Sequence, residues 1–153
     1  MDLILWRHAE AHLLREGQDD MQRSLTSKGE RQAKRMAEWL NQRLPESTRI
    51  LVSPAVRTQQ TAQALERRFK TVVLLAPEGS ADDLLKAARW PDSSEPVLIV
   101  GHQPTLGIVA ARLLAGADLP WSVKKGAVWW LAQRDREGVA QVTLLAMQGP
   151  DKV

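Results

Sequence analysis

The chain has 153 residues, of which 44% are hydrophobic and 25% are charged. This length and composition are typical of one globular domain with a substantial core and argue against wholesale disorder. Cysteine is absent, which excludes disulfides and thiolate metal sites and leaves three histidines and the carboxylates as metal ligands. The formal charge is only +3, and the basic residues are scattered without an aromatic-rich stripe. This pattern disfavours nucleic-acid binding and suits an anionic substrate.

The first residues do not resemble a signal peptide. No basic segment precedes the apolar residues 3–6, and that run is too short for the hydrophobic part of a leader. No stretch approaches the roughly 20 apolar residues of a membrane span. We therefore expect a cytoplasmic protein that does not associate with membranes and forms a single domain over residues 1–153.

Short apolar runs alternate with amphipathic segments along the chain. The runs are typical of strands buried on both faces and comprise residues 3–6, 50–52, 72–75 and 97–100. The segments between them predict helices over residues 28–44, 54–69, 82–90 and 104–114. Ser27 and Glu30 form a plausible capping box for the first helix. Ser53 is the expected N-cap of the second, with Pro54 at its first position.

The pattern changes towards the C-terminus. Residues 126–133 and 139–147 flank a charged, glycine-containing turn and predict a β-hairpin. Strands that alternate with helices favour a mostly parallel sheet covered on both faces. The predicted fold class is therefore α/β: a three-layer αβα sandwich with a mostly parallel central sheet and an antiparallel C-terminal hairpin.

Four basic side chains follow the ends of three predicted strands. Arg7 and His8 come directly after the first strand. Arg57 lies in the first turn of the helix after the second strand, and His102 follows the fourth. In an open α/β sheet, ligands bind beyond the carboxyl ends of the strands. We therefore expect these four side chains to lie together at one edge of the sheet.

Such a cluster suits a phosphoryl group. Two guanidinium groups offer bidentate donors to phosphate oxygens, and a helix N-terminus adds unpaired N–H groups. A bound dianion would relieve the repulsion among four potential cations, and the arginines should hold at least one histidine neutral. A neutral imidazole about 3–3.5 Å from phosphorus is a competent nucleophile.

Four motifs, in order along the chain, resemble those of the histidine phosphatase superfamily. They are residues 5–9 (Leu-Trp-Arg-His-Ala), 25–29 (Leu-Thr-Ser-Lys-Gly), 53–62 (Ser-Pro-Ala-Val-Arg-Thr-Gln-Gln-Thr-Ala) and 100–102 (Val-Gly-His). The resemblance covers essentially the whole chain. The small size and the Arg-His-Ala-Glu form are similar to the SixA-type phosphohistidine phosphatases in particular.

The resemblance implies a metal-independent phosphatase that needs no cofactor. His8 would attack phosphorus and become transiently phosphorylated, and water would then hydrolyse the phosphohistidine. Arg7, Arg57 and His102 would bind the phosphoryl oxygens and stabilise the charge of the transition state.

Two positions depart from the usual pattern of the superfamily. Ala9 stands where glycine is usual, as in SixA-like members, which bears on any backbone conformation that requires a positive φ. Larger relatives place a proton-donating carboxylate after the third strand, and here Glu78 is the first choice and Asp82 the second. A poorly defined acid favours a phosphohistidine substrate, because its imidazole leaves readily once protonated.

The expected substrate is phosphohistidine on a protein. Only 44 residues separate Arg57 from His102, too few for an additional helical lid, so an open site should admit a side chain of another protein. The alternatives are a small-molecule phosphomonoesterase of the same superfamily and a non-catalytic phosphate-binding module. A zinc site at His8 and His12 is disfavoured because Ala9 replaces the glutamate of the zincin pattern. No glycine-rich nucleotide motif is present.

Overall fold

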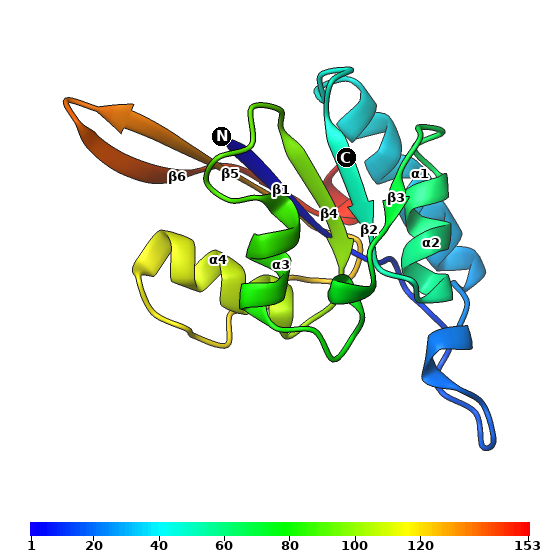
Figure 1. The fold of residues 1–153 in the computed structure, drawn as a ribbon. Coiled ribbons are helices and arrows are strands. Elements are labelled where there is room, and N and C mark those ends of the chain that lie inside the picture. The colour runs from blue at the N-terminus through cyan, green and yellow to red at the C-terminus, as the bar shows by residue number, and fades with distance from the viewer.

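The computed structural model describes residues 1–153 and contains one six-stranded sheet in the order β3-β2-β4-β1-β5-β6 (Figure 1). The strands are β1 (Asp2–Arg7), β2 (Arg49–Val52), β3 (Lys70–Thr71), β4 (Val97–Gly101), β5 (Val128–Arg136) and β6 (Val139–Gln148). The first four strands pair in parallel. β5 pairs antiparallel with β1, and β6 antiparallel with β5. The predicted α/β class with a C-terminal hairpin is confirmed.

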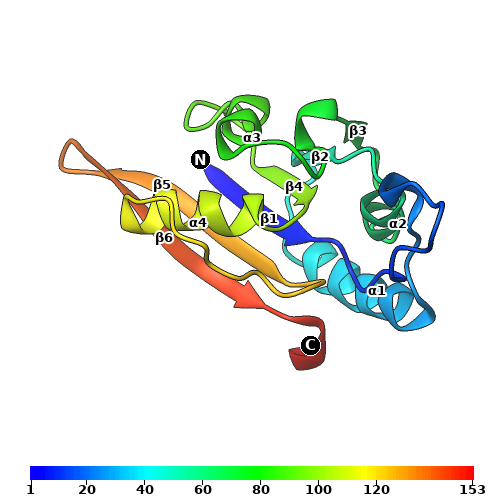
Figure 2. The ribbon, with the colours of Figure 1, turned by 90° about the horizontal axis from the view of Figure 1, so that it is seen from below.

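Helices cover both faces of the sheet. The α-helices are α1 (Ser27–Asn41), α2 (Val56–Gln63), α3 (Ala81–Ala88) and α4 (Thr105–Ala115), and the 3-10 helices are η1 (Asp20–Gln22), η2 (Val73–Leu75) and η3 (Pro150–Lys152). Figure 2 views the edge at which the parallel strands end, with α1 and α3 on opposite sides of the sheet. No helix combines the length and hydropathy needed to cross a bilayer.

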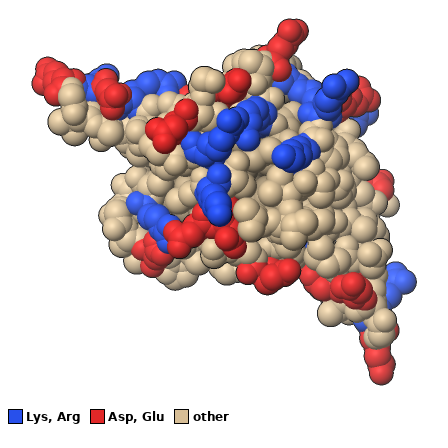
Figure 3. All heavy atoms as spheres, in the orientation of Figure 1, with Lys and Arg blue, Asp and Glu red and all other residues tan.

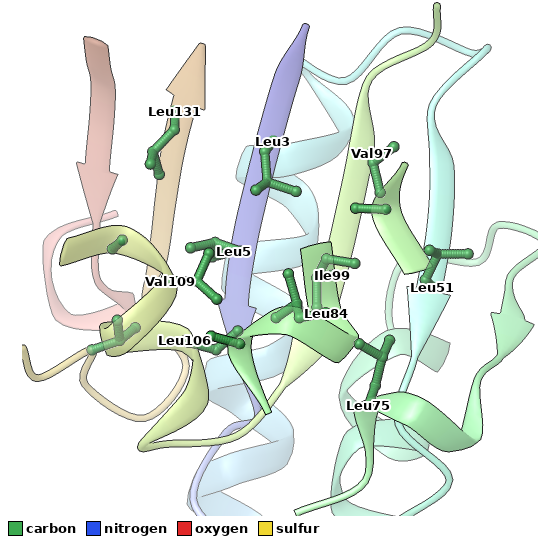
Figure 4. Close-up of a cluster of buried hydrophobic side chains, with 14 of the residues drawn as sticks. Leu3, Leu5, Leu51, Leu75, Leu84, Val97, Ile99, Leu106, Val109 and Leu131 are labelled. Carbon is green, nitrogen blue, oxygen red and sulfur yellow. The ribbon is translucent and has the colours of Figure 1, made fainter. Parts of the chain in front are cut away.

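The alternation of side chains along β1 explains its continuous apolar sequence. Leu3 and Leu5 belong to the core beneath α3 and α4, which Figure 4 shows, whereas Ile4 and Trp6 belong to the core beneath α1 and α2. All four are fully buried. Burying each such side chain stabilises the fold by about 1.5–3 kcal/mol. Polar residues therefore occur in this segment only where the strand ends. Arg7 is the first of them.

The predicted strand over residues 72–75 is wrong. Only Lys70 and Thr71 pair with β2, and the next residues form η2. Val73 is 78% exposed. The apolar run therefore lies at the edge of the sheet, where no further strand covers it and the chain is free to turn.

The predicted caps of the first two helices are also wrong. Thr26, not Ser27, is the N-cap of α1, and its hydroxyl accepts from the Gly29 N–H. The second helix is shorter than residues 54–69: it begins at Val56 without a side-chain cap, and Glu66 beyond its end has a φ of 54°. The remaining predicted elements are present, with ends that differ by no more than three residues.

Candidate active site

Three neighbouring strands end at the predicted site. Arg7 is the last residue of β1 and lies opposite Gly101, the last residue of β4. The backbone N–H of His8 donates to the Gly101 carbonyl at 3.2 Å. The ring centroids of His8 and His102 are 5.4 Å apart. Arg57 lies in the first turn of α2, near enough to both rings to lower their pKa values. The fold therefore brings the four predicted basic residues together.

His8 has one free ring nitrogen. Its Nδ1 lies 2.7 Å from the Ala9 carbonyl oxygen, and because a carbonyl only accepts, Nδ1 carries the hydrogen and Nε2 the lone pair. The side chain is 6% exposed. The pKa of His8 is lowered to about 4, mainly because the side chain is buried. The hydrogen bond to the Ala9 carbonyl raises this pKa, and the charges of Arg57 and Arg7 lower it further. Near neutral pH, His8 is thus uncharged, and burial is the largest single cause.

His102 presents the opposite nitrogen. Its Nε2 lies 2.7 Å from the Ser53 hydroxyl, which also accepts from the Ala55 N–H at 3.3 Å. The hydroxyl hydrogen has no other acceptor, so it is donated to Nε2, and the ring hydrogen of His102 is then on Nδ1. Burial, followed by Arg57 and His8, lowers the pKa of His102 to about 3. A neutral His102 therefore offers a single N–H donor.

Each arginine of the cluster is held at one end. Arg7 donates from Nη1 to the Val123 carbonyl at 2.9 Å. Arg57 donates from Nη1 to the Asp20 carbonyl at 2.8 Å and from Nη2 to the Asp20 carboxylate at 3.0 Å. The Nε–H of both arginines is buried without a partner. The side of each guanidinium that carries Nε is therefore the one that remains for a ligand.

Three atoms in the protein are buried side-chain nitrogens or oxygens without a hydrogen-bond partner, and all three belong to this cluster. They are Nε of Arg7, Nε of Arg57 and Nδ1 of His102. An unpaired buried donor costs about 1–3 kcal/mol, so natural structures rarely leave one without a reason. A tetrahedral oxyanion would accept from all three. The cluster therefore holds three unpaired donors that a bound anion could satisfy.

Asp20 belongs to the site but is not identified from the sequence. Its carboxylate bridges Nη2 of Arg57 at 3.0 Å and Nε of Arg23 at 2.9 Å. Desolvation raises the pKa of Asp20, but the hydrogen bonds from Arg23 and Arg57 outweigh it and lower that pKa. Asp20 thus offsets part of the positive charge and fixes Arg57. No motif surrounds it, and it lies 37 positions before Arg57 in the sequence, so only the tertiary structure reveals it.

Ala9 fits the site without the conformational freedom of glycine. Its φ is not positive. Its N–H donates to the Thr61 hydroxyl at 3.1 Å, and its methyl group is fully buried against Ala11, Leu25 and Ala33. The replacement of glycine therefore introduces no backbone strain next to His8.

The two candidate proton donors differ in their surroundings. Glu78 is exposed in the loop between η2 and α3 and makes no hydrogen bond. The next residue, Gly79, accepts from the hydroxyl of Thr105 at the start of α4, which ties this loop to the helix that follows His102. Asp82 instead pairs with Arg112 on the surface between α3 and α4. Of the two candidates, only Glu78 has a carboxylate outside any ion pair.

Comparisons with known proteins agree with this geometry. Residues 3–78 match the family model described as the histidine phosphatase superfamily (branch 1). The chain is 33% identical over 129 residues to the phosphohistidine phosphatase SixA homolog of Haemophilus influenzae, a match that covers 74% of this chain and 77% of that protein. It is 30% identical over 129 residues to the phosphohistidine phosphatase SixA of Escherichia coli K12, covering 78% of each.

A solved structure has the same fold. The protein histidine phosphatase SixA complexed with tungstate matches this chain with a TM-score of 0.81 and 25% identity, over 99% of this chain and 98% of that one. The four motifs, the shared fold and the sequence identity to the two relatives lead to one conclusion. The chain belongs to the histidine phosphatase superfamily and is a SixA-like phosphatase.

Proposed function

We propose that the protein hydrolyses phosphohistidine on another protein, without a metal, through a covalent intermediate on Nε2 of His8. The observation that carries the proposal is the set of three unpaired buried donors beside the free lone pair of His8. Tungstate is a tetrahedral oxyanion like phosphate, and the SixA protein solved with it supports the same kind of ligand here.

In the first step, the phosphoryl oxygens accept from Nε–H of Arg7, Nε–H of Arg57 and Nδ1–H of His102. The lone pair of His8 Nε2 forms a bond to phosphorus while the bond from phosphorus to the substrate imidazole breaks. The three donors stabilise the charge that spreads over the oxygens. The leaving imidazole takes up a proton, and Glu78 is the proposed donor.

In the second step, water attacks phosphorus and the bond to Nε2 breaks, which releases phosphate and restores His8. The Ala9 carbonyl accepts from Nδ1–H at 2.7 Å in the free enzyme. The same contact would stabilise the positive charge that the His8 ring acquires while it carries the phosphoryl group. Substrate and intermediate are both phosphohistidines, so the same three donors would stabilise the phosphoryl oxygens in both steps.

The loops around the site support a protein substrate. Only β3 and η2 lie between α2 and α3, so no α-helix is inserted at that point of the chain. Large apolar side chains are exposed on the loops that leave this edge: Leu13 is 83% exposed, Leu14 55% and Val73 78%. These side chains supply apolar area that a bound protein would cover.

Hydrolysis of p-nitrophenyl phosphate in EDTA tests the catalytic part of the proposal. His8→Ala should lower kcat by more than about 10³-fold, because the nucleophile is removed. The exposed His12 provides the matched control, and His12→Ala should keep the activity of the wild type. Negligible turnover by all three proteins would favour the non-catalytic module, and activity abolished by EDTA would refute metal independence.

A second comparison tests the substrate. The wild type should have a higher kcat/KM for a histidine-phosphorylated protein than for small alkyl phosphates. The reverse order would favour the small-molecule phosphomonoesterase.

A further inference from the structure

A second cluster of cations lies at the start of β2, the end away from His102. An open groove of about 1070 Å³ is lined by the beginnings of β2 and β3, the segment before β3 and the end of α3. Its cations are Arg49, Arg67, Arg68, Lys70 and Arg89, and Glu46 is its only carboxylate. In Figure 3, Lys and Arg side chains gather over the upper part of the face, around the beginnings of β2 and β4.

The charge of the groove exceeds that of the whole chain. Five cations against one carboxylate give the lining a formal charge of +4, whereas the chain as a whole carries +3. The rest of the chain therefore has a net charge of −1. The groove is thus a local concentration of positive charge on an otherwise nearly neutral protein.

The groove cations form no ion pair within the chain, and the charge of Glu95 offsets part of that of Arg49 and Arg89. None of the five ion pairs of the protein includes one of them. Arg67 donates only to neutral acceptors, one side-chain amide and two backbone carbonyls. The exposed side chains of Arg68, Lys70 and Arg89 make no hydrogen bond. These three are therefore free to pair with acidic groups of another molecule.

A single strand, β2, connects the groove to the active site. β2 leads from Arg49 in the groove to Ser53 beside His102, about 13 Å at about 3.3 Å per residue. Next to this path, η2 exposes Val73 by 78% and Leu74 by 40%. Leu74 also lines a small cavity together with His102. The groove and the active site therefore lie at the two ends of β2, and the exposed apolar side chains of η2 lie near the active-site end.

We propose that this groove is the docking site for an acidic patch on the phosphoprotein substrate, an inference that rests on the proposed function. A standard interface buries about 800 Å² on each partner, wide enough to cover the groove and the active site at once. Val73 and Leu74 would contact the partner between the two. The exposed cations would speed the encounter and select acidic partners.

A nucleic acid fits the groove less well. The five cations of the groove lie close together, so they offer no extended track for a phosphate backbone. The only aromatic residue of the lining, Phe69, is half-buried and provides no stacking platform. An acidic patch of limited size matches the groove in both charge and extent.

The test compares two variants that each reverse three charges. R68E/K70E/R89E changes the exposed cations of the groove, and R31E/K34E/R35E changes exposed cations of α1 that do not line the groove. The substrates are p-nitrophenyl phosphate, a phosphohistidine carrier domain with acidic residues beside its histidine, and the same domain with those residues changed to Asn and Gln.

The groove variant should lose at least about tenfold in kcat/KM for the acidic domain, mostly through KM. Its turnover of p-nitrophenyl phosphate should stay within about twofold, since the active site is untouched. The loss should disappear with the neutralised domain and in high salt, which screens exposed charges. The α1 variant should behave like the wild type with all three substrates.

Two results would overturn the docking site alone: no loss in the groove variant, or an equal loss in the α1 variant. Binding of an oligonucleotide that is lost only in the groove variant, with unchanged activity on the acidic domain, would reassign the groove to nucleic acid. A wild type that hydrolyses p-nitrophenyl phosphate but neither carrier domain would refute the proposed protein substrate itself.

Discussion

Lowering the pH from 7 to 5 should destabilise the fold through the two buried histidines. Their folded pKa values are about 4 for His8 and about 3 for His102, against 6.5 for an unperturbed histidine. Because the folded pKa lies below the unfolded one, the unfolded state binds more protons and the free energy of unfolding rises with pH. The contribution of the two histidines to the free energy of unfolding is therefore fully present above about pH 6.5. It is lost as the pH falls towards the pKa values of the folded state.

The magnitude follows from the same values. At pH 5 an unfolded histidine is almost fully protonated, whereas both folded rings stay largely neutral. Each histidine then lowers the free energy of unfolding by about 2 kcal/mol relative to pH 7, so the pair should lower it by about 4 kcal/mol. Asp20, with its lowered pKa, titrates below this range and does not contribute.

Urea unfolding followed by tryptophan fluorescence at the two pH values measures this effect. The double variant H8N/H102N should lose most of the pH dependence, because Asn does not titrate. The exposed His12 again serves as the control, and His12→Asn should keep the full decrease. A wild type that is equally stable at pH 7 and pH 5, or a double variant with an undiminished decrease, would refute the assignment of neutral buried rings.

Three substitutions probe the contacts around the cluster. Ser53→Ala removes the hydroxyl that donates to Nε2 of His102 and should lower kcat/KM for p-nitrophenyl phosphate about 10–100-fold, with little change in stability. An unchanged kcat/KM would show that this hydroxyl does not orient the His102 ring. Asp20→Ala removes the carboxylate that holds Arg57 and should lower kcat about tenfold in the same assay, and a higher kcat would instead mean that Asp20 competes with the substrate. Gly29→Ala places a Cβ against the backbone carbonyl oxygen of Glu10 and should cost about 3 kcal/mol in urea unfolding, whereas Gly149→Ala, with no atom within 4 Å, should cost less than about 0.5 kcal/mol; equal costs would contradict the close approach of Gly29 to Glu10.

The elements that position the site are predictable from the sequence because their burial is complete. β1 and β4 pack against helices on both faces, so each residue between their ends must be apolar. The first polar residues after them, Arg7 with His8 and later His102, then mark the strand ends. The α/β order places those ends at one edge, which is why the cluster can be located from local patterns.

The parts that are not predicted depend on contacts distant in sequence. Ser53 precedes a helix as an N-cap would, but its hydroxyl bonds to His102, 49 residues away. Asp20 lies in a polar loop, and its role appears only when η1 meets Arg57. Nothing local distinguishes these side chains from ordinary caps and surface charges. Similarly, the apolar residues of η2 resemble a strand because sequence alone does not show where a sheet ends.

Trapping the phosphorylated enzyme tests the nucleophilic role of His8 most directly. The wild type would be mixed with a phosphohistidine protein, quenched within milliseconds in alkali and analysed by phosphorus NMR and peptide mass spectrometry. Because Nδ1 of His8 donates a hydrogen bond to the Ala9 carbonyl, only Nε2 has a free lone pair. We therefore expect one phosphoryl group, on Nε2 of His8. Phosphate on Nδ1 or on another residue, or turnover without any phosphorylated enzyme, would contradict the proposed mechanism.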